Sequence, residues 1–500
     1  MPGRGAAASP PTRLRACPAG ACAPDHGLAP VRPRHSPLRR PALGRDVRSH
    51  EDEASTRDRI DMTFLIRSAA ALAAAFATSL ATAAPPAPPA SCHVGLYALA
   101  DGSSIDIAPS SDDQLRWRRR DGRSGAFATA GAQAGASRLG WTKRPDGHVV
   151  QLDGCDALRF DGVAGRRVPL VARELRFRSD GVELAGRLVM PPGDARVPVV
   201  VLLHGSEHDS ALEFDALQRR LPAEGIGAFV YDKRGTGASG GQYTQDFDQL
   251  ARDAVAALAV ARRLGGERVG RIGFEGPSQG GWVAPIAATH ADVDFVIVAF
   301  GLAVSVLEED RSAVAKNMAD HHHSPAATAQ AMALVDAADA LLLEPTLATY
   351  DRFAAVRDPL RKEPWYKDVH GDIAWAILPV QRDQVLAMAR QFDWHTPLLY
   401  DPLATIAAVK PPQLWVLAED DLDAPSAETA RRLAQLRMAG HPITSVVWPR
   451  TEHGVFEYET NAEGERTSLR QPEGYLALLA DFARGVPLAA KYGEVSPARP

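Results

Sequence analysis

From residue 170 onward, two hydrophobic patterns alternate along the chain. Short, almost continuous hydrophobic runs are expected of strands that are buried on both faces of a sheet. These runs lie at 197–203, 225–231, 272–274, 295–299, 413–417 and 443–448. The segment 248–264 instead repeats Leu250, Ala254 and Leu258 at helical spacing. Strands that alternate with helices predict a parallel sheet covered by helices on both faces.

A β-hairpin is predicted just before the first of these runs. The segments 174–178 and 182–189 flank Asp180-Gly181, a dipeptide typical of tight turns. Further upstream, residues 92–169 contain short alternating runs separated by Asp-Gly pairs that begin at positions 101, 121, 146 and 153. This pattern predicts a small antiparallel β module. Its residues suggest no chemistry, and a structural, partner-docking or substrate-binding role stays open.

The segment 301–410 interrupts the alternation, because it contains helical patterns at 326–343 and 380–391 but no convincing strand. It is also rich in aromatic residues: Tyr350, Phe353, Trp365, Tyr366, Trp375, Phe392, Trp394 and Tyr400. An insertion between two sheet strands would lie over the strand ends where ligands bind in open α/β sheets. We therefore expect a helical cap that shapes an apolar pocket. The alternative is a set of helices that pack beside the core.

The N-terminal region has the composition of processed rather than folded chain. Residues 1–61 are rich in Pro, Arg and Ala without hydrophobic periodicity, which indicates a disordered leader or a mis-annotated start before Met62. Residues 62–83 combine Arg67, a hydrophobic run at 69–80 and small residues up to Ala83, the pattern of a secretory signal peptide. The run is too short for a membrane span of about 20 residues. We expect export to the periplasm or beyond after cleavage near Ala83, although an Ala-rich amphipathic helix is the alternative.

Composition agrees with a soluble globular protein of more than one unit. The 500 residues are 45% hydrophobic and 23% charged, and the net charge of −5 argues against a nucleic-acid-binding protein. Of the four cysteines, Cys92 and Cys155 lie in the predicted exported part, where a disulfide is expected, with two free thiols as the alternative. The predicted parts are the leader (1–61), signal peptide (62–83), linker (84–91), β module (92–169), first core part (170–300), cap (301–410) and second core part (411–495).

The candidate nucleophile is Ser278 in Gly276-x-Ser278-x-Gly280. A strand ends just before this motif, and a helix begins at Gln279. Such a turn strains the backbone of the serine, and the flanking glycines remove the Cβ atoms that would collide there. The serine hydroxyl would then lie above the sheet at the positive end of a helix dipole.

A serine nucleophile needs a base, a carboxylate that orients the base, and donors for the oxyanion. His453 follows the last predicted strand and is the candidate base. The acidic residues Glu419, Asp420, Asp421 and Asp423 follow the strand before it. The nucleophile, the acid and the base therefore occur along the chain in the order Ser, Asp, His. We assign the oxyanion donors to the N–H groups of Gln279 and Ser206. Ser206 follows the first long hydrophobic run.

These motifs, from about Ala172 to Lys491, resemble the α/β-hydrolase superfamily, in particular its bacterial serine-hydrolase branch of esterases and aminopeptidase-like enzymes. The matching segments are His204-Gly205-Ser206, 231–239, 276–281, 421–425 and Glu452-His453-Gly454. The resemblance implies an α/β-hydrolase fold with a helical cap insertion. It also implies that Asp421, four residues before a proline, is the acid rather than Asp420 or Asp423. Asp232 and Arg234 would be fold-forming turn residues.

Two histidine features are assigned to structure rather than chemistry. His204 precedes Gly205 in the predicted oxyanion loop and is expected to support the backbone turn. His321-His322-His323 has the residue type of a metal site, but no carboxylate or cysteine at ligand spacing accompanies it, so a solvated loop is favoured.

The sequence therefore predicts an exported serine hydrolase that cleaves carboxylic esters of small, apolar acyl substrates through an acyl-enzyme, without metal or organic cofactor. A serine peptidase or an acyl-thioesterase is the alternative, because all three use the same residues. A non-catalytic binding protein on the same scaffold would need a lost member of the Ser, His and Asp set, and none is missing. Oligomeric state stays open.

Overall fold

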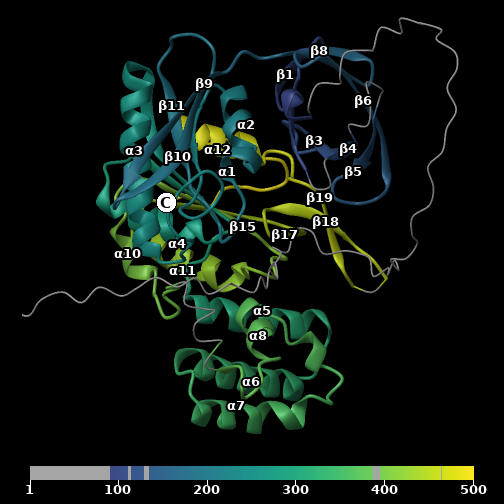
Figure 1. Cartoon of the computed structure of the whole chain (residues 1–500), viewed down its shortest axis with the longest axis vertical. Helices are drawn as coiled ribbons and strands as arrows, with labels where there is room; N and C mark the ends of the chain where they lie inside the picture. Colours follow the sequence, from purple (N-terminus) through teal and green to yellow (C-terminus); the bar gives the residue numbers. More distant parts are fainter. Residues whose placement is uncertain (1–89, 111–113, 129–134, 386, 388–394, 463) are drawn as a thin grey trace, which may run out of the picture. The chain divides into compact units, whose positions relative to one another are not determined.

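A computed structural model describes residues 90–110, 114–128, 135–385, 387, 395–462 and 464–500 (Figure 1). The chain divides into two units, 1–53 and 54–500, and all described residues belong to the second. The predicted leader, the predicted signal peptide at 62–83 and linker residues 84–89 lie outside the described residues.

The predicted β module is a closed antiparallel barrel, in which each strand pairs with the next and the last pairs with the first. Its strands are β1 (Gly95–Leu99), β2 (Ser104–Pro109), β3 (Gln114–Arg119), β4 (Ser124–Ala128), β5 (Gly135–Leu139), β6 (Pro145–Asp153), β7 (Ala157–Phe160) and β8 (Val163–Arg167). Tyr97, Trp117 and Phe127 are buried inside it with other apolar side chains. The interior is therefore a packed core.

The predicted disulfide between Cys92 and Cys155 is present. It joins η1 (Ala90–His93), the entry to the barrel, to the turn between β6 and β7. The guanidinium of Arg167 donates hydrogen bonds to the backbone carbonyls of both cysteines and of Val94. Because the two cysteines are 63 residues apart, the disulfide restricts nearly the whole barrel in the unfolded chain.

The core is one mixed sheet of eight strands in the order β16-β15-β14-β13-β11-β12-β10-β9. Its strands are β9 (Val171–Ser179), β10 (Val182–Met190), β11 (Val197–Leu202), β12 (Gly227–Tyr231), β13 (Val269–Pro277), β14 (Phe295–Ala299), β15 (Gln413–Ala418) and β16 (Ile443–Trp448). From β12 to β16 neighbouring strands are parallel, whereas β10 runs antiparallel to both β9 and β12. The predicted hairpin is confirmed, and both of its turn residues, Asp180 (φ 46°) and Gly181 (φ 79°), have positive φ.

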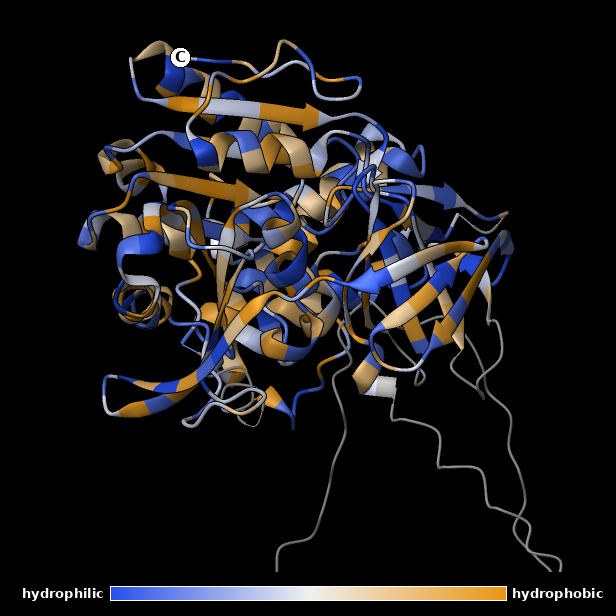
Figure 2. Ribbon diagram, turned by 90° about the horizontal axis from the view of Figure 1, so that it is seen from above, coloured by the Kyte–Doolittle hydropathy of each residue, from blue (hydrophilic) through white to orange (hydrophobic). Residues whose placement is uncertain are grey.

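Helices cover both faces of this sheet, as the alternating pattern predicts (Figure 1). One face packs against α3 (Phe247–Gly265), α4 (Gly280–His290), α10 (Leu403–Ala408) and α11 (Ser426–Met438). The other packs against α1 (Ala211–Phe214), α2 (Leu217–Ala223) and α12 (Tyr475–Arg484). A short 3-10 helix, η2 (Gly266–Arg268), follows α3. Figure 2 shows hydrophobic colour along the central strands, which are buried on both faces, and mixed colour along the barrel strands.

A helical insertion separates β14 from β15, as predicted. It contains α5 (Val306–Asp320), α6 (Pro325–Leu343), α7 (Leu347–Leu360), η3 (Tyr366–Asp368) and α8 (Asp372–Ile377). The predicted helix 326–343 is α6. The predicted helix 380–391 is wrong at its start, because residues 380–384 form turn and irregular structure, and its residues 386 and 388–391 lie outside the described ones. We call this insertion the cap.

Three of the predicted pocket aromatics lie in the core of the cap instead. Tyr350, Phe353 and Trp365 are buried in the cap's own core, between its helices. Trp375 is 56% exposed, and Tyr400 packs against Phe247 of α3. Phe392 and Trp394 lie outside the described residues. The prediction of a pocket lining is wrong for Tyr350, Phe353 and Trp365, because a small helical insertion needs large aromatic side chains to build a core of its own.

Helix α6 is, by length and composition, the one helix of the described residues that could cross a membrane. In this structure its apolar residues Leu334, Val335 and Leu341 are buried among the other cap helices. It also carries Asp336, which forms an ion pair with Arg311 of α5. The contacts of α6 are therefore those of a helix in the core of the cap.

A small antiparallel sheet lies between the last core strand and α12. It consists of β17 (Thr451–Glu452), β18 (Phe456–Thr460) and β19 (Arg466–Arg470). Trp141 of the barrel donates its backbone N–H to Ser468 O, and its ring packs edge-on against Phe456. The barrel thus contacts the strands that flank the candidate base.

A buried ion pair attaches the barrel to the core. Arg219 of α2 donates from Nε to Asp106 Oδ1 at 2.5 Å and from Nη2 to Oδ2 at 3.3 Å, and the side chains are only 9% and 2% exposed. Replacing Arg219 with Met should lower the free energy of unfolding by about 3–5 kcal/mol, because Asp106 would stay buried without its counter-charge. Urea denaturation measures this loss.

Arg120 is the matched control, since it also joins the barrel to α2, through Glu224, but is 63% exposed. Replacing Arg120 with Met should cost less than about 1 kcal/mol, and Glu224 keeps Arg484 as a partner. Equal losses for the two variants would contradict a special role for the buried pair.

Candidate active site

Ser278 occupies the strained turn that its motif predicts. It lies between the end of β13 and the start of α4 and has a φ of 48°. A Cβ atom on Gly276 would lie 2.2 Å from the carbonyl oxygen of Gly280, and a Cβ on Gly280 would lie 3.0 Å from that of His204. The first distance is impossible without backbone movement, so glycine is required there for steric reasons.

The structure brings His453 and Asp421 together with Ser278. His453 Nε2 lies 3.1 Å from Ser278 Oγ, and its Nδ1 lies 3.0 and 3.1 Å from the two carboxylate oxygens of Asp421. The three residues come from the ends of β13, β15 and β17, and the carboxyl ends of the parallel strands meet at one edge of the sheet. The distances are those of a hydrogen-bonded relay.

The three candidate acids of the loop have different surroundings. Asp421 is fully buried, and its Oδ1 also accepts the backbone N–H groups of Asp423 and Ala424 at 3.0 and 2.8 Å. Asp420 instead accepts a hydrogen bond from Tyr458, and Asp423 is exposed. The geometry therefore favours Asp421, the residue that the resemblance implies.

Asp421, Asp423 and His453 are also the one group of described residues whose ligand atoms all lie within 4.8 Å of one another, close enough to hold a metal ion. The imidazole Nδ1 and both Asp421 oxygens already face each other at hydrogen-bond distance. A cation there would compete with the hydrogen bond that orients His453. We therefore interpret the group as an acid-base pair with a neighbouring carboxylate.

His453 is held by its carboxylate partner and by an aromatic ring. Burial lowers the pKa of His453, but the charge and hydrogen bond of Asp421 outweigh burial and raise it above its usual value. The ring of Phe300 packs edge-on against the imidazole at 4.9 Å, and Phe300 itself has a φ of 42°. Phe300 follows β14 directly. The rule that strand ends line the site could have identified it, but no motif marks it.

The predicted oxyanion loop lies against the nucleophile. A Cβ atom on Gly205 would lie 3.4 Å from Ser278 Cβ, so this backbone passes directly beside the serine. Within the described part of the chain, the N–H groups of Ser206 and Gln279 donate to no protein acceptor. Two unused backbone donors beside a serine can stabilise an oxyanion.

His204 has the surroundings of a structural residue. Its Nε2 lies 2.5 Å from the carbonyl oxygen of Tyr231, and it is 7% exposed. Burial, reinforced by the charge of Lys233, lowers the pKa of His204 to about 3. The ring is therefore neutral and donates to a backbone oxygen.

Two histidines of the triplet contact the carboxylate of Asp368, which sequence spacing did not reveal. His323 Nε2 lies 2.8 Å from Asp368 Oδ2, and His321 Nε2 lies 3.8 Å from Asp368 Oδ1. Asp368 is 45 residues away from His323 along the chain. We interpret these contacts, a hydrogen bond and a longer polar contact, as holding the end of α5 against η3.

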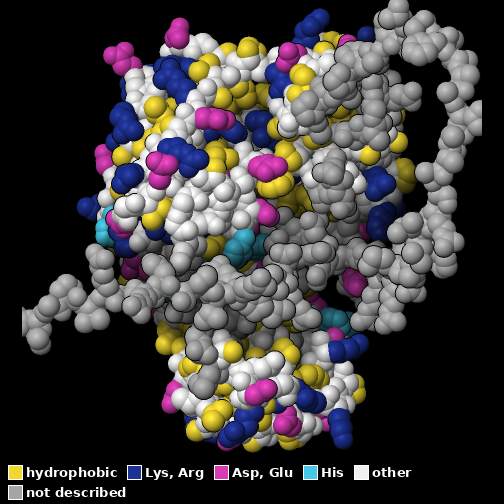
Figure 3. Space-filling view, in the orientation of Figure 1, with side chains coloured by type: hydrophobic (Ala, Val, Ile, Leu, Met, Phe, Trp, Pro, Cys, Tyr) yellow, Lys and Arg dark blue, Asp and Glu magenta, His cyan; other side chains and the backbone are white. Residues whose placement is uncertain are grey.

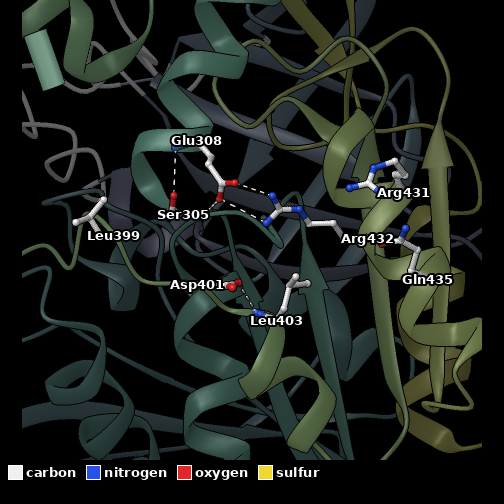
Figure 4. Close-up of a pocket in the computed structure, with 8 residues that line it drawn as sticks. All are labelled: Ser305, Glu308, Leu399, Asp401, Leu403, Arg431, Arg432 and Gln435. Atoms are coloured by element: carbon white, nitrogen blue, oxygen red, sulfur yellow. Dashed lines mark hydrogen bonds and ion pairs between the residues drawn. The ribbon is translucent and has the colours of Figure 1, made fainter. Parts of the chain in front are cut away.

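A separate pocket of about 440 Å³ lies where the cap joins the core (Figure 4). Its lining includes Ser305 and Glu308 at the start of α5 and Arg431 and Arg432 of α11. Arg432 pairs with Glu308 at 2.6 Å, and Ser305 and Glu308 form a capping box. None of the predicted site residues lines it. Because Arg432 of α11 joins Glu308 of α5 at this pocket, we interpret the pocket as part of the cap attachment.

On the face drawn in Figure 3, basic and acidic side chains are interspersed. This mixture agrees with the small net charge of −5.

Comparisons with known proteins match parts of this chain. The family model for X-Pro dipeptidyl-peptidases (S15 family) matches residues 180–368. The quorum-quenching protein AidA of Acinetobacter baumannii is 31% identical over 122 residues, which make up 24% of this chain. The chain matches only 40% of that relative's length.

Among solved structures, an esterase of Pyrococcus furiosus is 15% identical, covering 57% of this chain and 84% of its own, with a TM-score of 0.36. An acylaminoacyl peptidase of Pyrococcus horikoshii is 15% identical, covering 70% of this chain and 52% of its own, with a TM-score of 0.35. Similarities at this level carry no argument about activity.

The fold is assigned from the topology of the chain's own sheet and from its motifs. A mainly parallel sheet begins with an antiparallel hairpin, and a serine occupies a strained strand-to-helix turn at its centre. Together with the family match, these features show that the chain has the α/β-hydrolase fold.

Proposed function

We propose that the protein is a serine hydrolase that cleaves carboxylic esters of small molecules through an acyl-enzyme. The observation that carries the proposal is the chain of hydrogen-bond distances from Ser278 Oγ through His453 to the buried Asp421. The unused N–H groups of Ser206 and Gln279 beside the serine support it further.

In the proposed reaction, His453 Nε2 takes the proton of the Ser278 hydroxyl as Oγ attacks the ester carbonyl carbon. The carbonyl oxygen becomes an oxyanion, and the two N–H groups donate to it. His453 then gives its proton to the leaving alkoxide as the ester C–O bond breaks. Water, deprotonated by the same imidazole, attacks the acyl-enzyme and releases the acid and the free serine.

A peptidase is the second candidate, because residues 180–368 match the family model of X-Pro dipeptidyl-peptidases. An acyl-thioesterase would use the same groups. The predicted preference for apolar acyl chains has lost part of its basis, since Tyr350, Phe353 and Trp365 belong to the cap core. We therefore name the ester bond and leave chain length out of the proposal. Fold alone does not choose the substrate.

We also propose that the protein acts outside the cytoplasm. The disulfide between Cys92 and Cys155 supports this, because such bonds persist in oxidising compartments. The signal-peptide pattern at 62–83 supports it independently. N-terminal sequencing of the mature protein tests the proposal, and a start at Met1 would contradict it.

A fluorophosphonate probe should label the intact protein at Ser278, because the reagent reacts with activated serine hydroxyls. Replacing Ser278 with Ala should abolish labelling and lower kcat by roughly 10⁶-fold. Mass spectrometry of the labelled peptide identifies the site. Ser312 is a cap serine whose hydroxyl donates to Glu308 O, and replacing it with Ala should leave both the labelling and kcat unchanged. Labelling elsewhere, or activity that survives the Ser278 change, would refute the proposal.

The pH dependence of kcat/KM should report His453. Catalysis needs the neutral imidazole, so activity should rise with pH, and Asp421 should place the midpoint of this rise above 6.5. Replacing Asp421 with Asn removes the charge that favours the protonated ring, so the midpoint should move to lower pH, while kcat falls about 10⁴-fold. An unchanged midpoint in the Asp421 variant would contradict the assigned pairing.

A substrate panel separates the two candidate functions. Short-chain and long-chain p-nitrophenyl esters should be hydrolysed, whereas aminoacyl and X-Pro p-nitroanilides should react at least about tenfold more slowly. The comparison uses kcat/KM, since this ratio measures discrimination between substrates. Turnover of the anilides alone would replace the esterase proposal with the peptidase proposal.

A further inference from the structure

Lys233 is a buried cation with no place in the hydrolytic steps described above. It lies in the loop between β12 and α3 and is only 2% exposed. Its flanking residues have partners of their own: Asp232 accepts from Ser210 and Leu212, and Arg234 forms a buried ion pair with Asp253. Burying an ammonium group is costly unless hydrogen bonds compensate it.

All three hydrogen-bond acceptors of Lys233 are uncharged oxygen atoms next to the candidate site. Nζ donates to Gly205 O at 2.5 Å, to Glu207 O at 3.3 Å and to the side-chain oxygen of Gln279 at 3.4 Å. Gly205 and Glu207 flank Ser206, and Gln279 follows Ser278. One ammonium group therefore bridges the two backbone segments that supply the candidate oxyanion donors.

The bond to Gly205 also sets the direction of the Ser206 N–H. In a trans peptide, the C=O of one residue and the N–H of the next point in opposite directions. Because Lys233 holds the Gly205 carbonyl on one side, the N–H of Ser206 must point away from Lys233. The Gly205 Cα lies against Ser278, since a Cβ built on it would be 3.4 Å from Ser278 Cβ.

Tyr243, from the same loop as Lys233, holds the next peptide. Its hydroxyl donates to Ser206 O at 2.6 Å, and Lys233 Nζ lies 4.9 Å from the centre of its ring. The carbonyls of Gly205, Ser206 and Glu207 are thus all held by the loop after β12. Lys233 and Tyr243, which lie outside the oxyanion loop, therefore fix its backbone conformation.

We propose that Lys233 is a positioning residue that aims the Ser206 N–H at the oxyanion by holding the Gly205 carbonyl and the Gln279 side chain. The inference rests on the proposed serine-hydrolase function and deepens it. Lys233 touches neither substrate nor the reacting atoms, and it acts through the backbone that it holds. Its effect should therefore appear in the transition state, where the oxyanion exists, more than in substrate binding.

The first test replaces Lys233 with Met, which keeps the length of the side chain and removes its donors. With the best ester of the panel, kcat should fall about 10²–10³-fold, the loss expected for one oxyanion donor, while KM changes less than about threefold. Replacing Lys233 with Arg should restore part of kcat. Replacing Lys491, an exposed lysine, with Met is the matched control and should change neither constant.

A double-mutant cycle distinguishes positioning from a general effect on folding. Replacing Ser206 with Pro removes the N–H itself, so adding the Lys233→Met change to that variant should cost little more. Thermal denaturation establishes that each variant is folded. A folded Lys233→Met variant with kcat within about threefold of the parent, or additive losses in the cycle, would overturn the proposal.

The wild-type protein supplies a test that needs no Lys233 variant. Butylboronic acid should form a tetrahedral adduct at Ser278, and the amide protons of Ser206 and Gln279 should both shift downfield in the NMR spectrum. A shift at Gln279 alone would overturn the role of Lys233 while leaving the serine-hydrolase proposal standing. No adduct at Ser278, together with no fluorophosphonate labelling, would overturn both.

Discussion

The strained backbone at Ser278 is the constraint on which the rest of the site depends. A φ of 48° at a residue with a side chain costs about 1–3 kcal/mol, and surrounding structure must offset it. Gly276 and Gly280 leave the space for the turn. Gly281 and Gly301 let α4 approach the chain after β14, since a Cβ on either would lie 2.8 Å from the other's Cα. These close backbone approaches fix the position of Ser278, whose side chain is partly buried.

The sheet positions the other site residues, because they lie in loops that follow its strands. The loops that carry Ser206, Ser278 and Asp421 follow β11, β13 and β15, whose parallel registers bring their carboxyl ends to one edge. Polar contacts then hold these loops in place. Arg466 donates to Asp420 O and pairs with Asp320 of α5, which links the acid loop to the cap. A displacement of any loop would change the hydrogen-bond distances on which proton transfer depends.

The two added parts are attached by charge as well as by packing. The barrel contacts α2 through the buried pair of Asp106 and Arg219, and the cap contacts α11 through Glu308 and Arg432. Neither attachment involves Ser278, His453 or Asp421. Tyr350, Phe353 and Trp365 stabilise the cap itself. The charges that the cap places near the candidate site are a separate feature. Lys316 Nζ of α5 lies 3.9 Å from Asp420 Oδ1, and the charge of Glu309, also of α5, acts on His453.

The sequence by itself determined the core strands, the hairpin, the disulfide and the residues around Ser278, because these depend on local periodicity, turn glycines and short motifs. Tertiary structure alone decided the closure of the barrel, the burial of the cap aromatics, the pairing of Asp368 with the histidine triplet, and the contacts of Lys233 with the oxyanion loop. Each of these joins groups that are distant along the chain, as Lys233 and Gln279 are 46 residues apart. Spacing and composition carry no information about such contacts until the sheet register brings the loops together.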